Sequence, residues 1–236
     1  MKPFNPNEPV PGWTVERHLD MYRRGAFPMA DSAAPDEEIR WYLPYVRALM
    51  PLTEADGLHV SRTIERELRR RRFEFTTDQA FNQVIRRCAP PRDDDDGSWI
   101  DERIIAMYER LHEAGHVHSL EAWRTDPATG ERALVGGVYG LSLGAIFFAE
   151  SMFHVPQPRL SDGSRHPLDG TNASSCALIS LCRHLYTCGY QRMDAQVINE
   201  HTERFGAYEI DGSEFLAILT GAVRGPDRWQ PMSPGA

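Results

Sequence analysis

Asp194 and Gln196 place a carboxylate and an amide two residues apart, in a segment, Arg192–Val197, that has the pattern of a strand. Side chains at positions i and i+2 of a strand point to the same face of a sheet. Two polar residues on one face of an otherwise apolar strand suggest a functional site. The alternative is a satisfied polar network within the sheet, and the spacing alone leaves both interpretations open.

A second carboxylate, Glu150, follows the apolar run Ala145–Phe148 and precedes Ser151-Met152-Phe153. The run is typical of a buried strand. A carboxylate at its end would be half-buried, which is unfavourable unless the group is paired. Glu150 is therefore either a functional group or one member of a structural polar pair.

Two segments match the residue pattern of a known functional motif, but neither has the secondary structure that the motif requires. His112–His116 fits the H-E-x-x-H zinc signature, which needs both histidines on one continuous helix. Gly115 predicts that the helix ends before His116. The run Gly136–Gly140 lies inside a strand pattern, not between a strand and a helix, so it does not suit a dinucleotide. We expect neither a metal site nor a cofactor, and glycines within a strand indicate close approach of a ligand or another backbone.

Charge is unevenly distributed along the chain. The formal net charge is −8, which argues against a protein that coats nucleic acid by charge alone. The segment 61–72 nevertheless contains two glutamates and six arginines, which are Arg62, Arg66, Arg69, Arg70, Arg71 and Arg72. These arginines form either a phosphate-binding surface or a solvated helix face.

The remaining composition is that of a folded cytoplasmic protein. Of the 236 residues, 41% are apolar and 25% charged. No apolar run approaches the roughly 20 residues of a membrane span, and the start of the chain has no apolar signal region. The cysteines are expected to be reduced core or near-core residues, and they are Cys88, Cys176, Cys182 and Cys188. We expect a monomer.

Periodicity and turn signals predict an α+β fold. A small N-terminal α+β domain over residues 1–97 is expected to precede a mixed-sheet domain over 98–236. Predicted helices start at Thr14 and Ser61, cover 80–85, 101–114 and 173–188, and pass through Thr202. Ser213 is expected to cap a last helix that runs through Leu219. Predicted strands cover 39–43, 58–60, 73–76, 117–123, 134–141, 145–153, 192–197 and 207–210. Either Thr77 or Asp78 is expected to cap the helix over 80–85, and residues 154–172 form a long loop.

Several of these segments occur together in one order, and the ordered set is far more specific than any single motif. The segments are Tyr22–Pro28, Trp41–Arg47, Ser98–Ile100, Leu111–Trp123, Leu134–Gly140, Glu150–Phe153 and Asp194–His201. Together they make residues 14 to 220 resemble the bacterial leucyl/phenylalanyl-tRNA–protein transferases.

The resemblance implies a C-terminal domain related to the GCN5-type N-acetyltransferase fold. It implies transfer of Leu or Phe from aminoacyl-tRNA to proteins with an N-terminal Lys or Arg, which marks them for degradation by the N-end rule pathway. Asp194 and Gln196 would be the catalytic pair. Asp194 would orient Gln196 and help to draw off the proton of the attacking amine, directly or through a water.

The resemblance also implies the substrate contacts. The donor pocket would be formed by Val138, Phe147, Glu150, Ser151, Leu181 and Met193. Trp99 would stack near the terminal adenosine or the donor side chain, and Asn199 and Glu200 would face the acceptor. The arginines from Arg62 to Arg72 would contact the tRNA backbone.

Departures from the family pattern leave alternatives open. Met29 stands where the family usually has Trp, Ser175 stands where it usually has Lys, and the loop 154–172 is longer than usual. The alternatives are a tRNA-dependent aminoacyltransferase with a changed donor or acceptor, and an inactive paralogue that binds tRNA or degradation signals. An acyl-CoA acetyltransferase is disfavoured, because residues 154–175 contain no glycine loop for a pyrophosphate.

Overall fold

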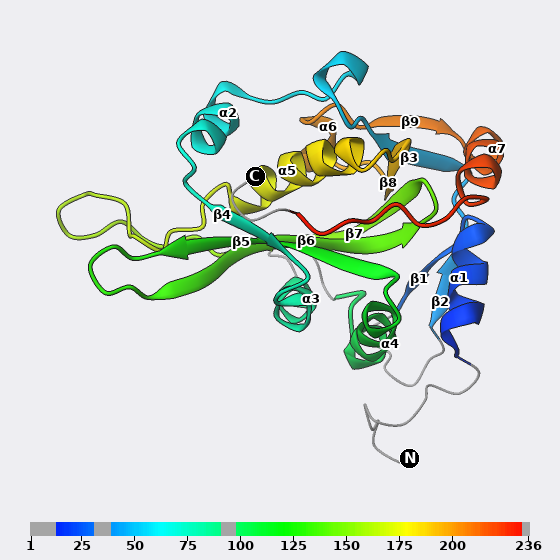
Figure 1. The fold of residues 1–236 in the computed structure, drawn as a ribbon, viewed down its shortest axis with the longest axis horizontal. Helices are drawn as coiled ribbons and strands as arrows, with labels where there is room; N and C mark the ends of the chain where they lie inside the picture. The colour runs from blue at the N-terminus through cyan, green and yellow to red at the C-terminus, as the bar shows by residue number, and fades with distance from the viewer. Residues whose placement is uncertain (1–12, 31–38, 91–97, 233–236) are drawn as a thin grey trace, which may run out of the picture.

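The computed structural model describes residues 13–30, 39–90 and 98–232. Its centre is a mixed sheet of seven strands in the order β4-β5-β6-β7-β8-β3-β9 (Figure 1). The strands are β3 (Val46–Met50), β4 (Glu74–Thr77), β5 (Val117–Thr125), β6 (Arg132–Leu143), β7 (Ile146–His154), β8 (Arg192–Gln196) and β9 (Tyr208–Asp211). Neighbouring strands are antiparallel except β7 and β8, which are parallel. The predicted α+β class is confirmed.

Helices cover both faces of this sheet, with α3 and α4 on one side and α2 and α5 on the other (Figure 1). The helices are α1 (Val15–Arg23), α2 (Arg62–Arg69), α3 (Phe81–Cys88), α4 (Glu102–Glu113), α5 (Ala173–Thr187), α6 (Glu200–Glu203) and α7 (Gly212–Ala222), with a 3-10 turn η1 (Glu54–Asp56). Two hydrophobic clusters result, one on each face. Adjacent residues of β7 divide between them, since Phe147 packs in one cluster and Phe148 in the other.

Both halves of the chain contribute to the main sheet. Strands β3 and β4 precede residue 97, and they pair with β8, β9 and β5, which follow it. The division of the chain into domains 1–97 and 98–236 stays a prediction, as does the kinship with the GCN5-type fold. A separate pair of strands, β1 (Phe27–Met29) and β2 (Arg40–Tyr42), joins α1 at one end of the molecule.

Strand β3 was not predicted, although it lies near the centre of the site described below. Its sequence, Val46-Arg47-Ala48-Leu49-Met50, is short, contains an arginine and is flanked by Pro44 and Pro51. Pairing with β8 and β9 and burial of four of its five residues outweigh these local signals. By contrast, residues 58–60, predicted to be extended, form no strand in the described structure.

Helix caps differ from the predictions at two places. Helix α3 starts after Ala80, and Glu121 of β5, rather than Thr77 or Asp78, accepts hydrogen bonds from the Gln79 and Ala80 N–H groups. Helix α7 is capped by Asp211 instead of Ser213, and it extends to Ala222. Other ends were predicted correctly, since Thr14, Ser61 and Asp101 cap α1, α2 and α4.

Glycines in and near β6 fulfil the structural roles predicted for them. A Cβ atom on Gly136 would lie 2.6 Å from the Cβ of Ala173, so the glycine lets α5 approach the sheet closely. Gly115 has a φ of +79° and follows the end of α4, which separates His116 from the helix that carries His112.

The helices among the described residues were also compared with the length and hydropathy of a membrane span. None of these described helices could cross a bilayer.

Candidate active site

A cavity of about 470 Å³ lies where strands β7 and β8 stop pairing. Their last paired residues are Phe148 and Asp194. Beyond this point, β7 lines the cavity with Ala149, Glu150, Ser151, Met152 and His154, and the chain after Asp194 lines it with Ala195, Gln196 and Val197. Because the two parallel strands separate here, polar groups such as Glu150 and Gln196 line a cavity between them.

Glu150 is the carboxylate that faces this cavity. Its Oε1 accepts a hydrogen bond of 2.6 Å from the Tyr22 hydroxyl, and its Oε2 accepts one of 2.9 Å from Nε2 of Gln196. Burial raises the pKa of Glu150 to about 7, although both hydrogen bonds favour the ionised form. Near neutral pH this group therefore exists in both protonation states.

Two tyrosines extend the hydrogen-bond chain from Glu150 into the core. The hydroxyls of Tyr22, from α1, and Tyr108, from α4, lie 2.5 Å apart. Burial raises the pKa of both phenols well above the ordinary value, so both remain protonated donors. Tyr22 therefore donates to Glu150 and accepts from Tyr108, which fixes the carboxylate in the wall of the cavity.

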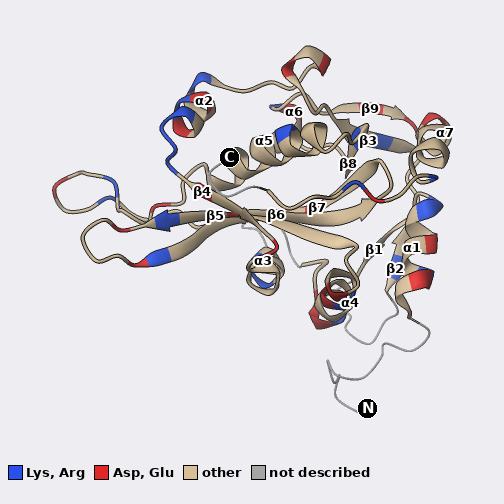
Figure 2. Ribbon diagram, viewed as in Figure 1, with Lys and Arg blue, Asp and Glu red and all other residues tan. Residues whose placement is uncertain are grey.

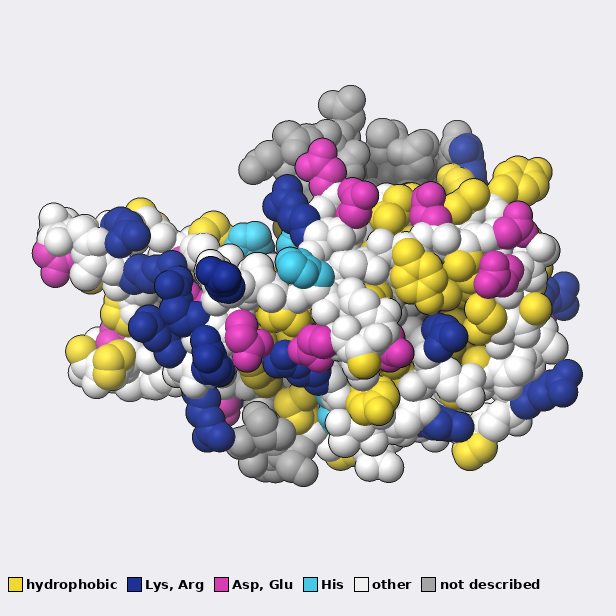
Figure 3. Space-filling view, turned by 90° about the horizontal axis from the view of Figure 1, so that it is seen from above, with side chains coloured by type: hydrophobic (Ala, Val, Ile, Leu, Met, Phe, Trp, Pro, Cys, Tyr) yellow, Lys and Arg dark blue, Asp and Glu magenta, His cyan; other side chains and the backbone are white. Residues whose placement is uncertain are grey.

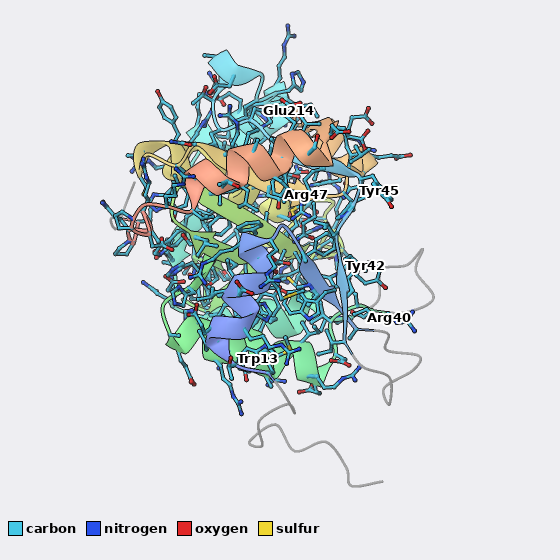
Figure 4. The ribbon with its side chains drawn as sticks, turned by 90° about the vertical axis from the view of Figure 1, so that its right-hand side faces the viewer. Trp13, Arg40, Tyr42, Tyr45, Arg47 and Glu214 are labelled. Atoms are coloured by element: carbon cyan, nitrogen blue, oxygen red, sulfur yellow. The ribbon has the colours of Figure 1, made fainter. Side chains whose placement is uncertain are left out.

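Asp194 lies behind the cavity wall and is fully buried. The guanidinium of Arg47, from β3, donates hydrogen bonds to both oxygens of the Asp194 carboxylate. Its Nε lies 2.8 Å from Oδ1, and its Nη2 donates to Oδ2. Arg47 is itself 1% exposed, donates to the Gly25 carbonyl and stacks over the ring of Phe215. Figure 4 shows Arg47 inside the molecule beside α7, whereas Tyr45 projects outwards.

Gln196 is held in an unusual backbone conformation. Its φ is +62°, which non-glycine residues rarely adopt, and the Val197 N–H donates to the Ala195 carbonyl to close a three-residue turn. The Gln196 N–H donates to Oδ1 of Asp194 at 2.8 Å. Asp194 thus stabilises the turn that directs the Gln196 amide towards Glu150.

The rest of the cavity lining is mainly apolar. It includes Met29, Trp99, Val138, Met152, Leu178 and Met193. The backbone of Trp99 is held in place because its carbonyl accepts a hydrogen bond from the N–H of Ala30, which follows β1. His154 and Ser174 add polar atoms to the lining, with the Ser174 hydroxyl 3.3 Å from Nδ1 of His154.

Most of the predicted substrate contacts come together around this cavity. The lining includes Trp99, Val138, Glu150, Ser151, Met193, Gln196 and Asn199. Phe147 and Leu181 lie in the adjoining hydrophobic cluster, which also contains Val138 and Met193. Glu200 is the exposed first residue of α6, outside the cavity lining, and is 3.7 Å from Arg204. Asn199 caps the same helix.

The predicted tRNA-binding arginines lie on and after α2, away from this cavity. Arg62, Arg66, Arg69, Arg70 and Arg71 are exposed. Arg72 is turned inward, with its guanidinium 2.8 Å from Asp169 and 3.2 Å from Glu67. Figure 2 marks a run of basic residue positions on the ribbon at α2 and the segment after it.

Comparison with known proteins assigns the family. The family model described as leucyl/phenylalanyl-tRNA protein transferase matches residues 52–220. The chain belongs to this family. A leucyl/phenylalanyl-tRNA–protein transferase from Anaeromyxobacter dehalogenans strain 2CP-C is 40% identical over 224 residues, which cover 93% of this chain and 85% of that protein. Another, from Solidesulfovibrio magneticus, is 41% identical over 210 residues, covering 89% and 74%.

Three residues of the site in this transferase were not predicted from the sequence. Arg47 was overlooked with its strand, although a lone arginine in an apolar run is itself a signal of a buried partner. Tyr22 and Tyr108 have the spacing of ordinary core residues on their helices. Nothing in the sequence alone indicates that their hydroxyls meet beside Glu150.

Proposed function

We propose that this protein transfers Leu or Phe from aminoacyl-tRNA to the N-terminal Lys or Arg of acceptor proteins in the cytoplasm, and so marks them for degradation. As a member of its family, the chain is an aminoacyltransferase. The observation that supports the proposal most directly is the cavity in which Glu150 and Gln196 share a lining with apolar side chains.

The apolar lining suits the side chain of the donor amino acid. Methionine, leucine and valine side chains offer an adaptable surface for Leu or Phe and no partner for a polar side chain. Glu150, which shares this lining, would accept a hydrogen bond from the α-amino group of the donor. Trp99 would stack on the terminal adenosine or on the donor side chain.

The reaction is aminolysis of an ester. The acceptor nitrogen bonds to the ester carbonyl carbon, the tetrahedral intermediate collapses, and the C–O bond to the terminal ribose breaks. The amine loses one proton and the ribose hydroxyl gains one. The donor is an activated ester, so no nucleotide hydrolysis is needed. Positioning of amine and ester contributes much of the rate in such reactions.

Gln196 and Asp194 would play different parts in this step. Gln196 reaches the cavity and would hydrogen-bond the attacking amine through its amide oxygen, because its Nε2 already donates to Glu150. Asp194 is fully buried and paired with Arg47, so it would act through the turn at Gln196. Asp194 is therefore proposed as a positioning residue.

The acceptor would approach past α6. Glu200 and Glu203 lie in this helix, and carboxylates suit the cationic side chain of an N-terminal Lys or Arg. Asn199 holds the start of the helix through hydrogen bonds from the His201 and Thr202 N–H groups. It would thereby place these carboxylates beside the cavity.

A transfer assay tests the proposal. Purified protein is offered tRNAs charged with radiolabelled Leu, Phe, Met or Trp, and peptides that begin with Arg, Lys, Asp, Glu or Met. We expect Leu and Phe to appear on the Arg and Lys peptides. Transfer of another amino acid, or transfer to an acidic N-terminus, would replace the proposed specificity, and tRNA binding without transfer would favour the inactive paralogue.

A further inference from the structure

A second concave site, separate from the cavity, lies between α2 and the far ends of β4 and β5. This cleft of about 790 Å³ is lined by Arg66, Glu67, Arg70, Arg71, Arg72, Glu74, Trp123, Arg124, Thr125, Pro127 and Arg165. Six of these residues are arginines and two are glutamates, so the lining carries a formal charge of +4 in a chain whose net charge is −8. Figure 3 shows the cluster of basic side chains on this part of the surface.

The long loop 154–172 contributes Arg165 to the cleft, and Asp169 fixes the conformation of the base of this loop. The Asp169 carboxylate accepts hydrogen bonds from the N–H groups of Gln157 and Thr171, from the Thr171 hydroxyl and from Arg72. Although burial opposes it, these bonds hold the pKa of Asp169 well below its ordinary range. The base of the loop is thus tied to the segment that follows α2.

Two arginines complete this attachment. Arg72 bridges Asp169 and the buried carboxylate of Glu67 on α2. Arg124 of β5 donates to the Pro167 carbonyl in the loop and to the Arg72 carbonyl. The guanidiniums of Arg72 and Arg124 therefore hold the loop against the segment after α2 and against β5.

The remaining arginines present their charge to the solvent side. Within the described residues, Arg66, Arg70 and Arg71 have no ion-pair partner. Arg165 comes from the loop and is 42% exposed, with Nη1 3.5 Å from Glu67. Glu67 is shared with Arg72, so one carboxylate balances two guanidiniums. The cleft thus gathers cationic side chains from α2, from the segment after it and from the loop, which suits the binding of linked phosphates.

We propose that the 154–172 loop is part of the RNA-binding surface, and that it adds Arg165 to Arg66, Arg70 and Arg71 in one cleft that holds the phosphodiester backbone of the donor tRNA. The inference rests on the proposed function, because it takes aminoacyl-tRNA as the donor. It assigns Arg72, Arg124 and Asp169 to positioning and Arg165 to direct contact.

The experiment measures binding of Leu-tRNA to full-length protein by fluorescence anisotropy over a range of salt concentrations, together with the transfer rate. Arg165→Ala should weaken binding several-fold at low salt, and it should reduce the slope of log K against log salt by roughly one, as expected for the loss of one phosphate contact. Arg71→Ala should act similarly. Arg86→Ala is the matched control, because α3 lies on the opposite face of the sheet and the same charge is removed.

The outcomes separate this inference from the proposed function. If Arg165→Ala and Arg86→Ala have equal slopes while the wild-type protein binds tRNA and transfers Leu, the loop is not part of the surface and only this inference fails. If Arg165→Ala lowers the slope while the wild-type protein binds tRNA without transfer, the surface stands and the proposed function fails. An increase in KM for tRNA with unchanged kcat would give further support.

Discussion

Two carboxylates beside one cavity have different surroundings, and this difference separates their roles. Asp194 faces the guanidinium of Arg47, whereas Glu150 is hydrogen-bonded by neutral donors, Tyr22 and Gln196. Burial without a cation raises the pKa of Glu150 to about 7. Asp194 is thus held in an ion pair, whereas Glu150 is a group that changes its protonation state near neutral pH.

Glu150→Gln should lower kcat/KM for transfer by about 10- to 100-fold, because a hydrogen bond to a charged group typically contributes roughly 1.5–3 kcal/mol. The wild-type rate should rise with pH through about 7, as Glu150 ionises and can bind the donor amino group. The variant should retain only the rise that the acceptor amine causes at higher pH. Steady-state kinetics from pH 5.5 to 9 measure both effects.

Stability gives an independent test of the Glu150 assignment. A carboxyl group whose pKa is higher in the folded protein than in the unfolded chain keeps its proton longer when folded, so the free energy of unfolding falls as pH rises from about 4.5 to 7. Glu150→Gln should remove this decrease. Parallel pH dependence of Tm in both proteins over this interval would contradict the raised pKa.

Arg47→Met should destabilise the protein by about 3–5 kcal/mol, because it leaves the buried Asp194 carboxylate without its cation. The double variant Arg47→Met/Asp194→Asn should be less destabilised than Arg47→Met alone. Denaturant unfolding of the two single variants and the double variant measures the coupling. Additive losses would mean that the ion pair does not stabilise the fold in the way its geometry indicates.

At the scale of elements, the cavity depends on how strands meet and not on any one motif. The predicted strand order along the chain around β5, β6 and β7 is confirmed, and so is the helix α5 that follows the long loop. The insertion of β3 between β8 and β9 was not predictable from local pattern. This insertion brings Arg47 to Asp194, which is 147 residues away in the sequence.

The contact between α5 and β6 leads to a prediction about glycine. Gly136→Ala should cost about 1–3 kcal/mol, because the new Cβ would lie 2.6 Å from the Cβ of Ala173. Gly221→Ala in α7 is the control, since nothing lies within 4 Å of its Cβ position, and it should be neutral or stabilise by up to about 1 kcal/mol. Chemical denaturation compares the two, and equal effects would contradict the close packing.

At the scale of the whole molecule, the segment after α7 runs back from that helix over the central strands of the sheet (Figure 1). Its Trp229 stacks on His118 with ring centres 4.3 Å apart, and its indole N–H donates to Asp78 at 3.0 Å. Asp227 accepts a hydrogen bond of 2.6 Å from Ser142. The C-terminal segment therefore joins β5, β6 and the segment between β4 and α3.

Trp229→Ala should lower stability by about 2 kcal/mol, since a partly buried indole loses less than the 3–5 kcal/mol typical of a buried one. For a chain of this length, this corresponds to a decrease in Tm of roughly 4–8 °C. Tyr45→Ala is the control, because this side chain is 94% exposed, and its Tm should not change. Thermal unfolding followed by circular dichroism tests both variants.

The sequence by itself determined the elements whose signals are local. Apolar periodicity, capping residues and glycine stops identified α1, α4, α5 and the strands from β5 to β8, and the ordered motifs identified the family. It also singled out Asp194, Gln196 and Glu150 as polar groups in apolar strands. What these groups contact was decided only by the tertiary structure, because the pairing of Asp194 with Arg47 and of Glu150 with Tyr22 joins residues that are distant in the chain. Burial then sets the pKa of Glu150, and burial is a property of the packed molecule.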